Sequence, residues 1–215
     1  MTVVSTEIER KSIPTLVKDS ELVVQKRREI VDAAVGLFIR KGYHQTTTRE
    51  IAREAGFSIG SLYEYIASKE DILYLVCDAI HGEMEGRLRN EMVEGRTVAD
   101  TLHGAIDAYL RVCDRMQDSI LLIYRETASL AQDYRRYVLQ NETRVTEIFA
   151  RILEEGFASG AFQFDEMKTV HLMAHNIVVL GHMWAFRRWF LRDEFSLDEY
   201  IRYQSSFITR ELSGK

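Results

Sequence analysis

The chain contains a single proline, Pro14, and this feature constrains its fold more than any other. Proline breaks the interior of a helix because it lacks a backbone N–H and clashes with the preceding turn. No proline interrupts the sequence after residue 14. Hydrophobic residues make up 46% of the chain and charged residues 28%, which is the balance of an ordinary globular protein. The sequence therefore predicts an almost entirely helical globular chain.

Apolar residues at helical spacing predict about nine helices and no strand. From Ile30 to Phe38 they recur at the i, i+3, i+4 and i+7 positions of one helix face. Gly42 follows this run and is placed as a C-terminal stop. The later helices are expected at roughly 97–116, 118–130, 133–158, 165–192 and 197–212. The predicted fold class is accordingly all-α.

Two short helices joined by a tight glycine turn are predicted between Thr47 and Ile66. Thr47 is placed to cap the first helix, and Glu50 follows three residues later to complete a capping box. Gly56 stops that helix and Ser58 caps the next one. The buried face of the second helix is expected to consist of Ile59, Leu62 and Ile66. Two such helices form a helix-turn-helix.

The formal net charge of −5 argues at first sight against a nucleic-acid partner. Residues 24–69 differ from this average, because they hold eight basic and five acidic side chains, a net charge of +3. A basic head on an acidic body favours contact with DNA. The triplet from Lys26 to Arg28 has two interpretations, a solvated helix start or an arm-like contact with the minor groove, and both stay open.

The run from Thr46 to Leu73, TTTREIAREAGFSIGSLYEYIASKEDIL, resembles the DNA-binding signature of TetR/AcrR-type transcriptional regulators. The residues from Ile30 to Tyr43 are similar to the first helix of that family. This resemblance implies a helix-turn-helix head of three helices and a helical ligand-binding and dimerisation domain. The expected boundaries are an N-terminal arm at 1–20, mobile or loosely docked, a DNA-binding domain at 21–70 and an effector-binding and dimerisation domain at 71–215.

The resemblance also implies which positions contact DNA. Gly60 lacks a side chain, so the recognition helix can approach the DNA backbone closely. Tyr63 and Tyr65 are expected on the face left over by the buried residues, where a hydroxyl reaches a phosphate or a base edge. In an isolated Tyr-x-Tyr motif the two residues would be interpreted as ordinary aromatic surface residues. Within the run from Thr46 to Leu73, the resemblance implies that they contact DNA. The expected DNA-binding residues are Thr47, Thr48, Arg49, Ser58, Gly60, Ser61, Tyr63, Tyr65 and Lys69.

A homodimer is implied as well, because the family builds a symmetric four-helix bundle from its last two long helices. One recognition helix reads too few base pairs for specificity, so the geometry of DNA reading also requires a dimer. Residues 165–192 and 197–212 fit these two helices. The aromatic anchors expected in the interface are Trp184, Phe190, Tyr200, Tyr203 and Phe207.

A small-molecule effector is the second implied partner, bound between helices that start near residues 69, 97, 118, 133 and 165. The candidate lining residues, each of which would singly be assigned to the core, are His103, Tyr109, Cys113, Tyr124, Arg125, Met173 and Asn176. Aromatic residues and methionines favour a largely apolar effector. Some regulators that this chain resembles sense fatty acyl-CoA thioesters, which is the favoured class, and cationic multidrug ligands compete with it. The helix at 71–90 is the expected lever for release from DNA.

Other functions find little support in the sequence. It lacks a Gly-rich phosphate loop, a nucleophile elbow and a catalytic acid pair, so neither enzymatic activity nor a cofactor is predicted. A DNA-bound structural or division-control protein on the same fold is the alternative function. His171 and His175 have the spacing of two metal ligands but lack a third, so no metal is expected.

Cys77 and Cys113 are too few and too scattered for a disulfide framework, and they are interpreted as buried free thiols. The chain shows no signal peptide and no apolar run of membrane-spanning length. A cytoplasmic protein without a membrane partner is the expectation.

Overall fold

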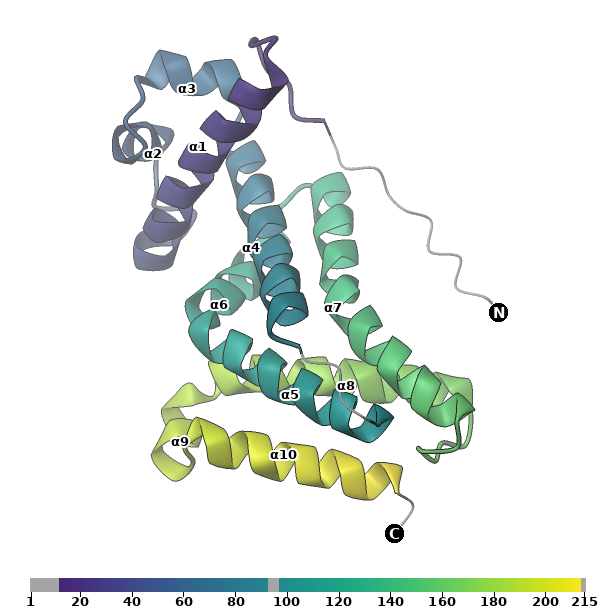
Figure 1. Cartoon of the computed structure of the whole chain (residues 1–215). Coiled ribbons are helices and arrows are strands. Elements are labelled where there is room, and N and C mark those ends of the chain that lie inside the picture. The colour runs from purple at the N-terminus through teal and green to yellow at the C-terminus, as the bar shows by residue number, and fades with distance from the viewer. Residues whose placement is uncertain (1–11, 93–96, 214–215) are drawn as a thin grey trace. The chain divides into compact units, whose positions relative to one another are not determined.

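The structure is a computed structural model that describes residues 12–92 and 97–213. Within these residues the chain forms helices and no strand, so the all-α prediction is confirmed (Figure 1). The helices are α1 (Ser20–Lys41), α2 (Thr48–Glu54), α3 (Ile59–Tyr65), α4 (Lys69–Glu91), α5 (Val98–Arg115), α6 (Gln117–Glu126), α7 (Gln132–Ala158), α8 (Met167–Phe186), α9 (Arg188–Glu194) and α10 (Leu197–Leu212), with a 3₁₀ turn at Thr127–Ser129.

The helices belong to two compact units. The head unit comprises Met1–His81 and Leu122–Asn141, and the C-terminal unit comprises Gly82–Leu121 and Glu142–Lys215. The head unit therefore includes the first part of α4, the end of α6 and the start of α7 in addition to the first three helices. Each unit has its own apolar core.

In the head unit, α1, α2 and α3 pack against one another. The side chains at the centre of this core are Ile30, Ala34, Phe38, Ile51, Leu62 and Ile66, all essentially inaccessible to solvent. Three of them lie on α1 at the predicted helical spacing, so this helix buries the face that the sequence indicated.

The ends of the head helices are fixed by caps that the sequence predicted. Thr47 accepts the N–H of Glu50 while the Glu50 carboxylate accepts the N–H of Thr47, so the capping box is confirmed. The Ser58 hydroxyl accepts the N–H of Ser61 at 3.0 Å and begins α3. Gly42 ends α1 with φ of 85°, a left-handed conformation that favours glycine.

In the C-terminal unit, α5 contacts both α8 and α10 (Figure 1). The approach to α8 is close, because a Cβ atom at Gly181 would lie 2.4 Å from Tyr109 and 2.6 Å from the Cys113 sulfur. The Tyr109 hydroxyl donates to the backbone carbonyl of Val178 at 3.1 Å across the same contact. A glycine on α8 is therefore what allows these two helices to pack at this distance.

The predicted helix at 165–192 is two helices in the structure. α8 ends at Phe186, the following Arg187 leaves the helical region with φ and ψ of −104° and 20°, and α9 starts directly after it. The break allows two arginines of α9 to reach carboxylates near the end of α5: Arg192 pairs with Asp114 at 2.6 Å and Arg188 with Asp118 at 3.1 Å. This separation accounts for the tenth α-helix in the described residues. No helix among them is long and apolar enough to cross a membrane.

Candidate nucleic-acid interface

α2 and α3 form the two arms of a helix-turn-helix. The turn between them reverses direction at Gly56, whose φ is 76°. The N–H of Phe57 donates to the carbonyl of Ala52 at 2.8 Å and closes the turn. A non-glycine residue at position 56 would be strained in this backbone conformation. The tight turn that the sequence predicted is thus built from these residues.

The face that α3 presents to solvent differs from the predicted one at two positions. Ile59, expected to be buried, is 39% exposed, and Tyr65, expected to be exposed, is 7% exposed. The physical reason is the ring of Phe57 from the preceding turn, which packs edge-on against Tyr65 at 6.0 Å. The exposure predicted for Tyr65 is therefore wrong, and its side chain contributes to the core.

The remaining candidates on α3 lie on one surface together with the start of α2. Ser58 and Gly60 are exposed, Ser61 is half-buried and Tyr63 is 44% exposed. The Tyr63 hydroxyl lies 3.2 Å from the Thr48 hydroxyl, so the two helices meet through polar groups at the surface. A Cβ at Gly60 would meet only the Ser58 hydroxyl at 3.8 Å, so this edge of α3 is open.

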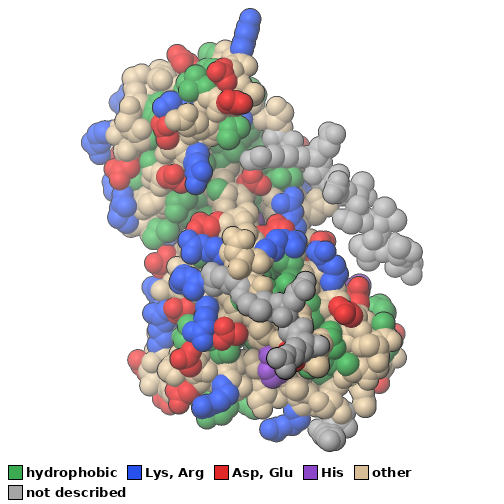
Figure 2. Space-filling model, in the orientation of Figure 1, with side chains coloured by type: hydrophobic (Ala, Val, Ile, Leu, Met, Phe, Trp, Pro, Cys, Tyr) green, Lys and Arg blue, Asp and Glu red, His purple; other side chains and the backbone are tan. Residues whose placement is uncertain are grey.

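The charges at the start of α2 are unevenly balanced. Lys41 pairs with Glu50, and this ammonium, together with the backbone and hydroxyl donors of Thr47, lowers the pKa of Glu50 to about 2. Glu50 therefore stays ionised and compensates Lys41. Arg49 and Arg53 are exposed and have no ion-pair partner among the described residues. Figure 2 shows basic and acidic side chains interspersed on the visible face.

Lys69 stands at the start of α4, as predicted, but its ammonium is engaged within the head unit. It lies 4.3 Å from the centre of the Tyr43 ring and 3.4 Å from the carbonyl oxygen of His44. Burial lowers the pKa of Lys69, while burial raises that of Tyr43. The side chain is half-buried and would have to extend to reach a phosphate.

The segment before α1 packs against the helix-turn-helix, which was not predicted from the sequence. A mobile or loosely docked arm was predicted at 1–20, yet Ile13 is 4% exposed and the N–H of Leu16 donates to Glu64 at 2.9 Å. Residues 1–11 of that arm, and the helix break predicted at Gly95, lie outside the described residues. An isolated isoleucine beside the lone proline, Pro14, was the available signal for a docked segment.

The predicted effector-binding residues do not form one group. Tyr124 and Arg125 belong to the head unit, where both are exposed and Arg125 donates to Glu126 and to the carbonyl of Phe38. The others belong to the C-terminal unit. There Tyr109 and Cys113 are core residues packed against α8. They were predicted together because they belong to the helices that the resemblance places around the effector.

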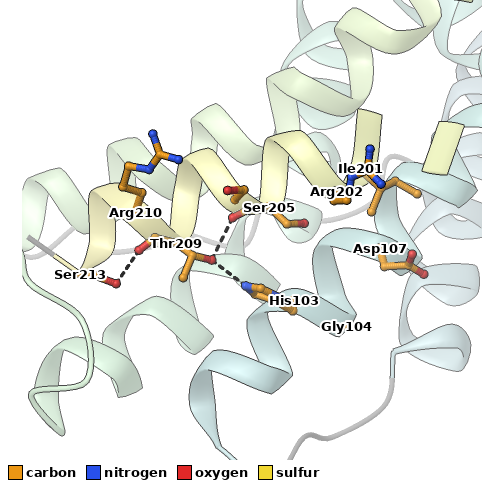
Figure 3. A pocket seen from close by; sticks show the side chains of 10 residues that line it. His103, Gly104, Asp107, Ile201, Arg202, Ser205, Thr209, Arg210 and Ser213 are labelled. Carbon is orange, nitrogen blue, oxygen red and sulfur yellow. Dashed lines mark hydrogen bonds between the residues drawn. The ribbon is translucent and has the colours of Figure 1, made fainter. Parts of the chain in front are cut away.

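Met173 and Asn176 line a surface hollow near the end of α10, together with Phe157, Phe162 and Leu212. His103 lies elsewhere, in a groove of about 800 Å³ between α5 and α10 (Figure 3). Its Nε2 is 2.6 Å from the Thr209 hydroxyl, whose own hydrogen goes to the Ser205 carbonyl at 2.8 Å. Nε2 therefore donates to Thr209.

The predicted interface anchors fall into two classes. Trp184 and Tyr200, with 2% and 5% exposure, pack against each other within the protomer, their ring centres 4.8 Å apart and their planes tilted by 37°, so their assignment to a partner surface is wrong. Burial of the Trp184 ring is completed by its indole N–H, which donates to Asp114 at 2.8 Å. The exposed aromatic side chains on α9 and α10 are Trp189, Phe190, Tyr203 and Phe207. Trp189, the most exposed at 66%, was absent from the prediction.

Two family models match the chain. The N-terminal model of bacterial regulatory proteins of the tetR family matches residues 30–74, which cover most of α1 and the helix-turn-helix. A C-terminal domain model described as tetracyclin repressor-like matches residues 95–204. The chain belongs to the TetR family. It is therefore a transcriptional regulator of a family whose members bind operator DNA and act as dimers.

Similar proteins agree with the TetR assignment. The HTH-type transcriptional regulator HbdR of Aromatoleum sp. (strain CIB) is 35% identical over 89% of this chain and 82% of its own length. A TetR-family regulatory protein from Rhodococcus RHA1 superposes with a TM-score of 0.73, at 24% identity, over 87% of this chain and 97% of its own. AibR, solved in complex with isovaleryl coenzyme A and operator DNA, gives 0.68 at 16% identity, over 85% and 97%.

Proposed function

We propose that this TetR-family chain is a repressor that binds its operator as a homodimer and is released by an acyl-CoA thioester. The observation that carries the DNA-binding part is the polar surface shared by α2 and α3. Thr48 and Tyr63 meet there at 3.2 Å, with Arg49 exposed and uncompensated beside them. Hydroxyls and a free guanidinium on a helix-turn-helix are donors suited to phosphates and base edges.

The proposed DNA contacts are Thr47, Thr48, Arg49, Ser58, Gly60, Ser61, Tyr63 and Lys69. Tyr63 has the most to contribute, because its ring is rigid and its hydroxyl is at the surface. Arg49 adds a charge that can be exchanged for condensed counterions of DNA. Tyr65 is left out of this set because its side chain is buried.

The DNA-binding proposal is tested with a duplex recovered by selection from a random-sequence library on the full-length protein. Tyr63→Ala is expected to weaken binding to this duplex by about 1–3 kcal/mol, because one polar contact is lost. Tyr124→Ala is the matched control, since Tyr124 is 45% exposed and Tyr63 44%. Equal affinity of both variants and the wild type in a gel-shift titration would remove Tyr63 from the interface.

We assign the dimer surface to the exposed side chains of α8, α9 and α10. They include Leu172 on α8, Trp189 on α9 and Phe207 on α10, which are 57%, 66% and 57% exposed. Apolar side chains gathered on consecutive helices favour a protein–protein contact over isolated surface positions. Phe207→Asp is expected to give monomers in sedimentation analysis with unchanged helical content. A dimer of wild-type affinity would place the contact elsewhere.

The effector part of the proposal has a different basis. AibR, which shares the fold, binds isovaleryl coenzyme A, and aromatic and methionine residues in the C-terminal unit suit an apolar acyl chain. An effector lowers operator affinity only if it prefers a conformation that binds DNA poorly. A coupling of about 1–3 kcal/mol would weaken operator binding by roughly 5- to 150-fold.

The effector is tested by titrating isovaleryl-CoA and a long-chain acyl-CoA against the protein–duplex complex. Free CoA and a cationic dye serve as controls for the nucleotide moiety and for multidrug ligands. Release by a thioester and not by free CoA supports the proposal. Release by the dye alone favours a multidrug regulator, and a complex that none of them disturbs favours a structural DNA-binding protein.

A further inference from the structure

The last backbone carbonyls of the recognition helix α3 receive no hydrogen bond from a continuing helix. It has seven residues, and its C-cap Ile66 is extended, with φ of −139° and ψ of 154°. The carbonyls of the last turn lack partners further along a helix. The N–H of Ser68, which would serve Glu64 in a longer helix, instead donates to Asp71 at 2.7 Å. The carbonyls of Glu64 and Tyr65 therefore need donors from outside the helix-turn-helix.

A segment far away in the sequence supplies the donors for Glu64. The N–H of Leu16 and the hydroxyl of Thr15 both donate to the Glu64 carbonyl, each at 2.9 Å. Ile13, at the start of this segment, is 4% exposed and anchors it by burial. We name residues 13–16 the N-terminal clamp. Forty-nine residues separate Thr15 from the carbonyl that it satisfies.

Arg27 of α1 joins the clamp to the end of α3. Its Nε donates to the Tyr65 carbonyl at 3.0 Å. A terminal nitrogen of the same guanidinium donates to the carbonyls of Ile13 at 2.8 Å and Pro14 at 3.3 Å. One planar fork thus holds the same two chain segments that the hydrogen bonds to the Glu64 carbonyl also join. A lysine carries the charge but lacks this fork.

The contacts of the basic triplet from Lys26 to Arg28 show which of its side chains are already engaged within the head unit. Lys26 pairs with Glu29 at 2.9 Å and lies 5.4 Å from the centre of the Phe57 ring. Arg27 is occupied by backbone carbonyls. Arg28 is exposed and has no hydrogen-bond or ion-pair partner among the described residues. Of the three, Arg28 alone is available to DNA without breaking a contact in the head.

We propose that the N-terminal clamp and Arg27 position the recognition helix for DNA, and that Arg27 acts through α3 without touching DNA itself. The proposal rests on the proposed function, in which α3 reads the operator. Tyr63 lies in the last turn of α3, one residue before the clamped carbonyl. Short helices are marginal on their own, so the orientation of this turn depends on what holds its end.

The test compares Arg27→Lys with Arg27→Gln in operator titrations at several salt concentrations. Both variants lose the fork, so both are expected to bind about tenfold more weakly. The slope of log affinity against log salt should stay at the wild-type value, because no phosphate contact is lost. If Arg27 contacted a phosphate, Arg27→Lys would retain affinity and Arg27→Gln would reduce the slope by about one unit. That pattern would overturn the proposal.

A second, milder variant separates positioning from folding. Thr15→Val keeps the shape of the side chain and removes one donor to Glu64. It should weaken operator binding about threefold at a temperature where circular dichroism shows the protein fully folded. In a double-mutant cycle with Arg27→Lys the two effects should be non-additive, since both loosen the same helix end. Lower thermal stability with wild-type affinity would reduce the clamp to a purely structural element and refute the proposal.

Tyr63→Ala in the same assay separates the two levels of inference. Weak binding by Tyr63→Ala, together with normal binding by Arg27→Lys and Thr15→Val, refutes the clamp and leaves the DNA interface in place. Normal binding by all three refutes both. Weak binding by all three, with an unchanged salt slope for the Arg27 variants, supports both.

Discussion

The head unit and the C-terminal unit place their exposed apolar side chains in different ways. In the head unit they are scattered over separate elements: Leu16 before α1, Val24 on α1, Ile59 and Tyr63 on α3, Tyr124 on α6 and Leu139 on α7. In the C-terminal unit they lie on three consecutive helices: Met167 and Leu172 on α8, Trp189 and Phe190 on α9, and Tyr203 and Phe207 on α10. Single exposed apolar residues on separate elements are ordinary for a protein surface, and Tyr63 among them is proposed as a DNA contact. The exposed apolar residues of α8, α9 and α10 are the basis on which we propose the dimer surface.

The units also differ in how their helices are held. The two helices of the helix-turn-helix have seven residues each, and long-range hydrogen bonds to backbone carbonyls hold the end of α3. The C-terminal unit relies on side-chain packing between long helices, with Gly181 at the contact of α8 with α5. Substitutions at the contacts that hold the end of α3 should therefore change DNA binding more than stability, and core substitutions in the C-terminal unit should do the opposite.

Trp184→Ala should produce the largest loss of stability. The ring is 2% exposed, packs at a tilt against Tyr200 and donates to Asp114, so its removal leaves a cavity and takes away one of the two donors to that carboxylate, the other being Arg192. We expect the free energy of unfolding to fall by about 3–5 kcal/mol in urea denaturation. Trp189→Ala, at 66% exposure, is the control. It should leave unfolding at low protein concentration nearly unchanged while weakening the dimer. Equal effects of both substitutions would contradict the division between core and surface tryptophans.

Two glycine substitutions sharpen the comparison between the units. Gly181→Ala should destabilise the protein by about 1–3 kcal/mol, because the added methyl overlaps Tyr109 and Cys113. Gly60→Ala has room in the protein and should keep or slightly raise stability through helix propensity. Its operator affinity should nevertheless fall, because the methyl lies on the proposed DNA surface. Thermal unfolding and gel-shift titrations of both variants would distinguish them, and a stable Gly181→Ala protein would show that α5 and α8 can separate freely.

Tyr134→Phe examines the contact between α4 and α7 within the head unit. The Tyr134 hydroxyl donates to Asp71, a 4% exposed carboxylate that also accepts the N–H groups of Ala67 and Ser68. Loss of one donor to a buried charge should cost about 1–2 kcal/mol of unfolding free energy. Tyr137→Phe is the matched control. Tyr137 is about as buried as Tyr134, and both rings pack against the ring of Tyr74. An unchanged stability for both would show that Asp71 is satisfied without Tyr134.

The smallest expected effect appears at alkaline pH. Burial raises the pKa of Tyr200 to about 12 from its ordinary value near 10. The unfolded chain therefore loses this proton first, so the contribution of Tyr200 to stability is complete below about pH 10 and is lost as pH rises toward 12. Tyr200→Phe should decline less steeply than the wild type in this range in denaturation curves. A decline as steep as that of the wild type would contradict a stabilising contribution from the protonated Tyr200 side chain.

Local signals explain which parts of the fold could be predicted. The capping box of Thr47 and Glu50 and the stop at Gly42 involve residues within a few positions of one another, so the sequence displays them directly. The buried face of α1 follows from its regular spacing over several turns. These elements position the helix-turn-helix.

Contacts between distant segments explain the errors. α3 has too few turns to define a face by spacing, and a ring from the preceding turn, Phe57, decides that Tyr65 is buried. Trp184 and Tyr200 lie on different helices, so only the packed structure reveals that their rings contact each other. The donors to Glu64 come from a segment 49 residues earlier, which no local pattern can indicate.

The two buried cysteines are natural reporters of local opening, one in each unit. Cys77 lies in the head unit and Cys113 in the C-terminal unit, and both side chains are inaccessible to solvent. Burial raises the pKa of each thiol to about 12, so neither forms the thiolate that alkylating reagents require near neutral pH. Each sulfur can react only when its surroundings open. The labelling rates of the two thiols therefore measure local opening of the two units independently, in the unmodified protein.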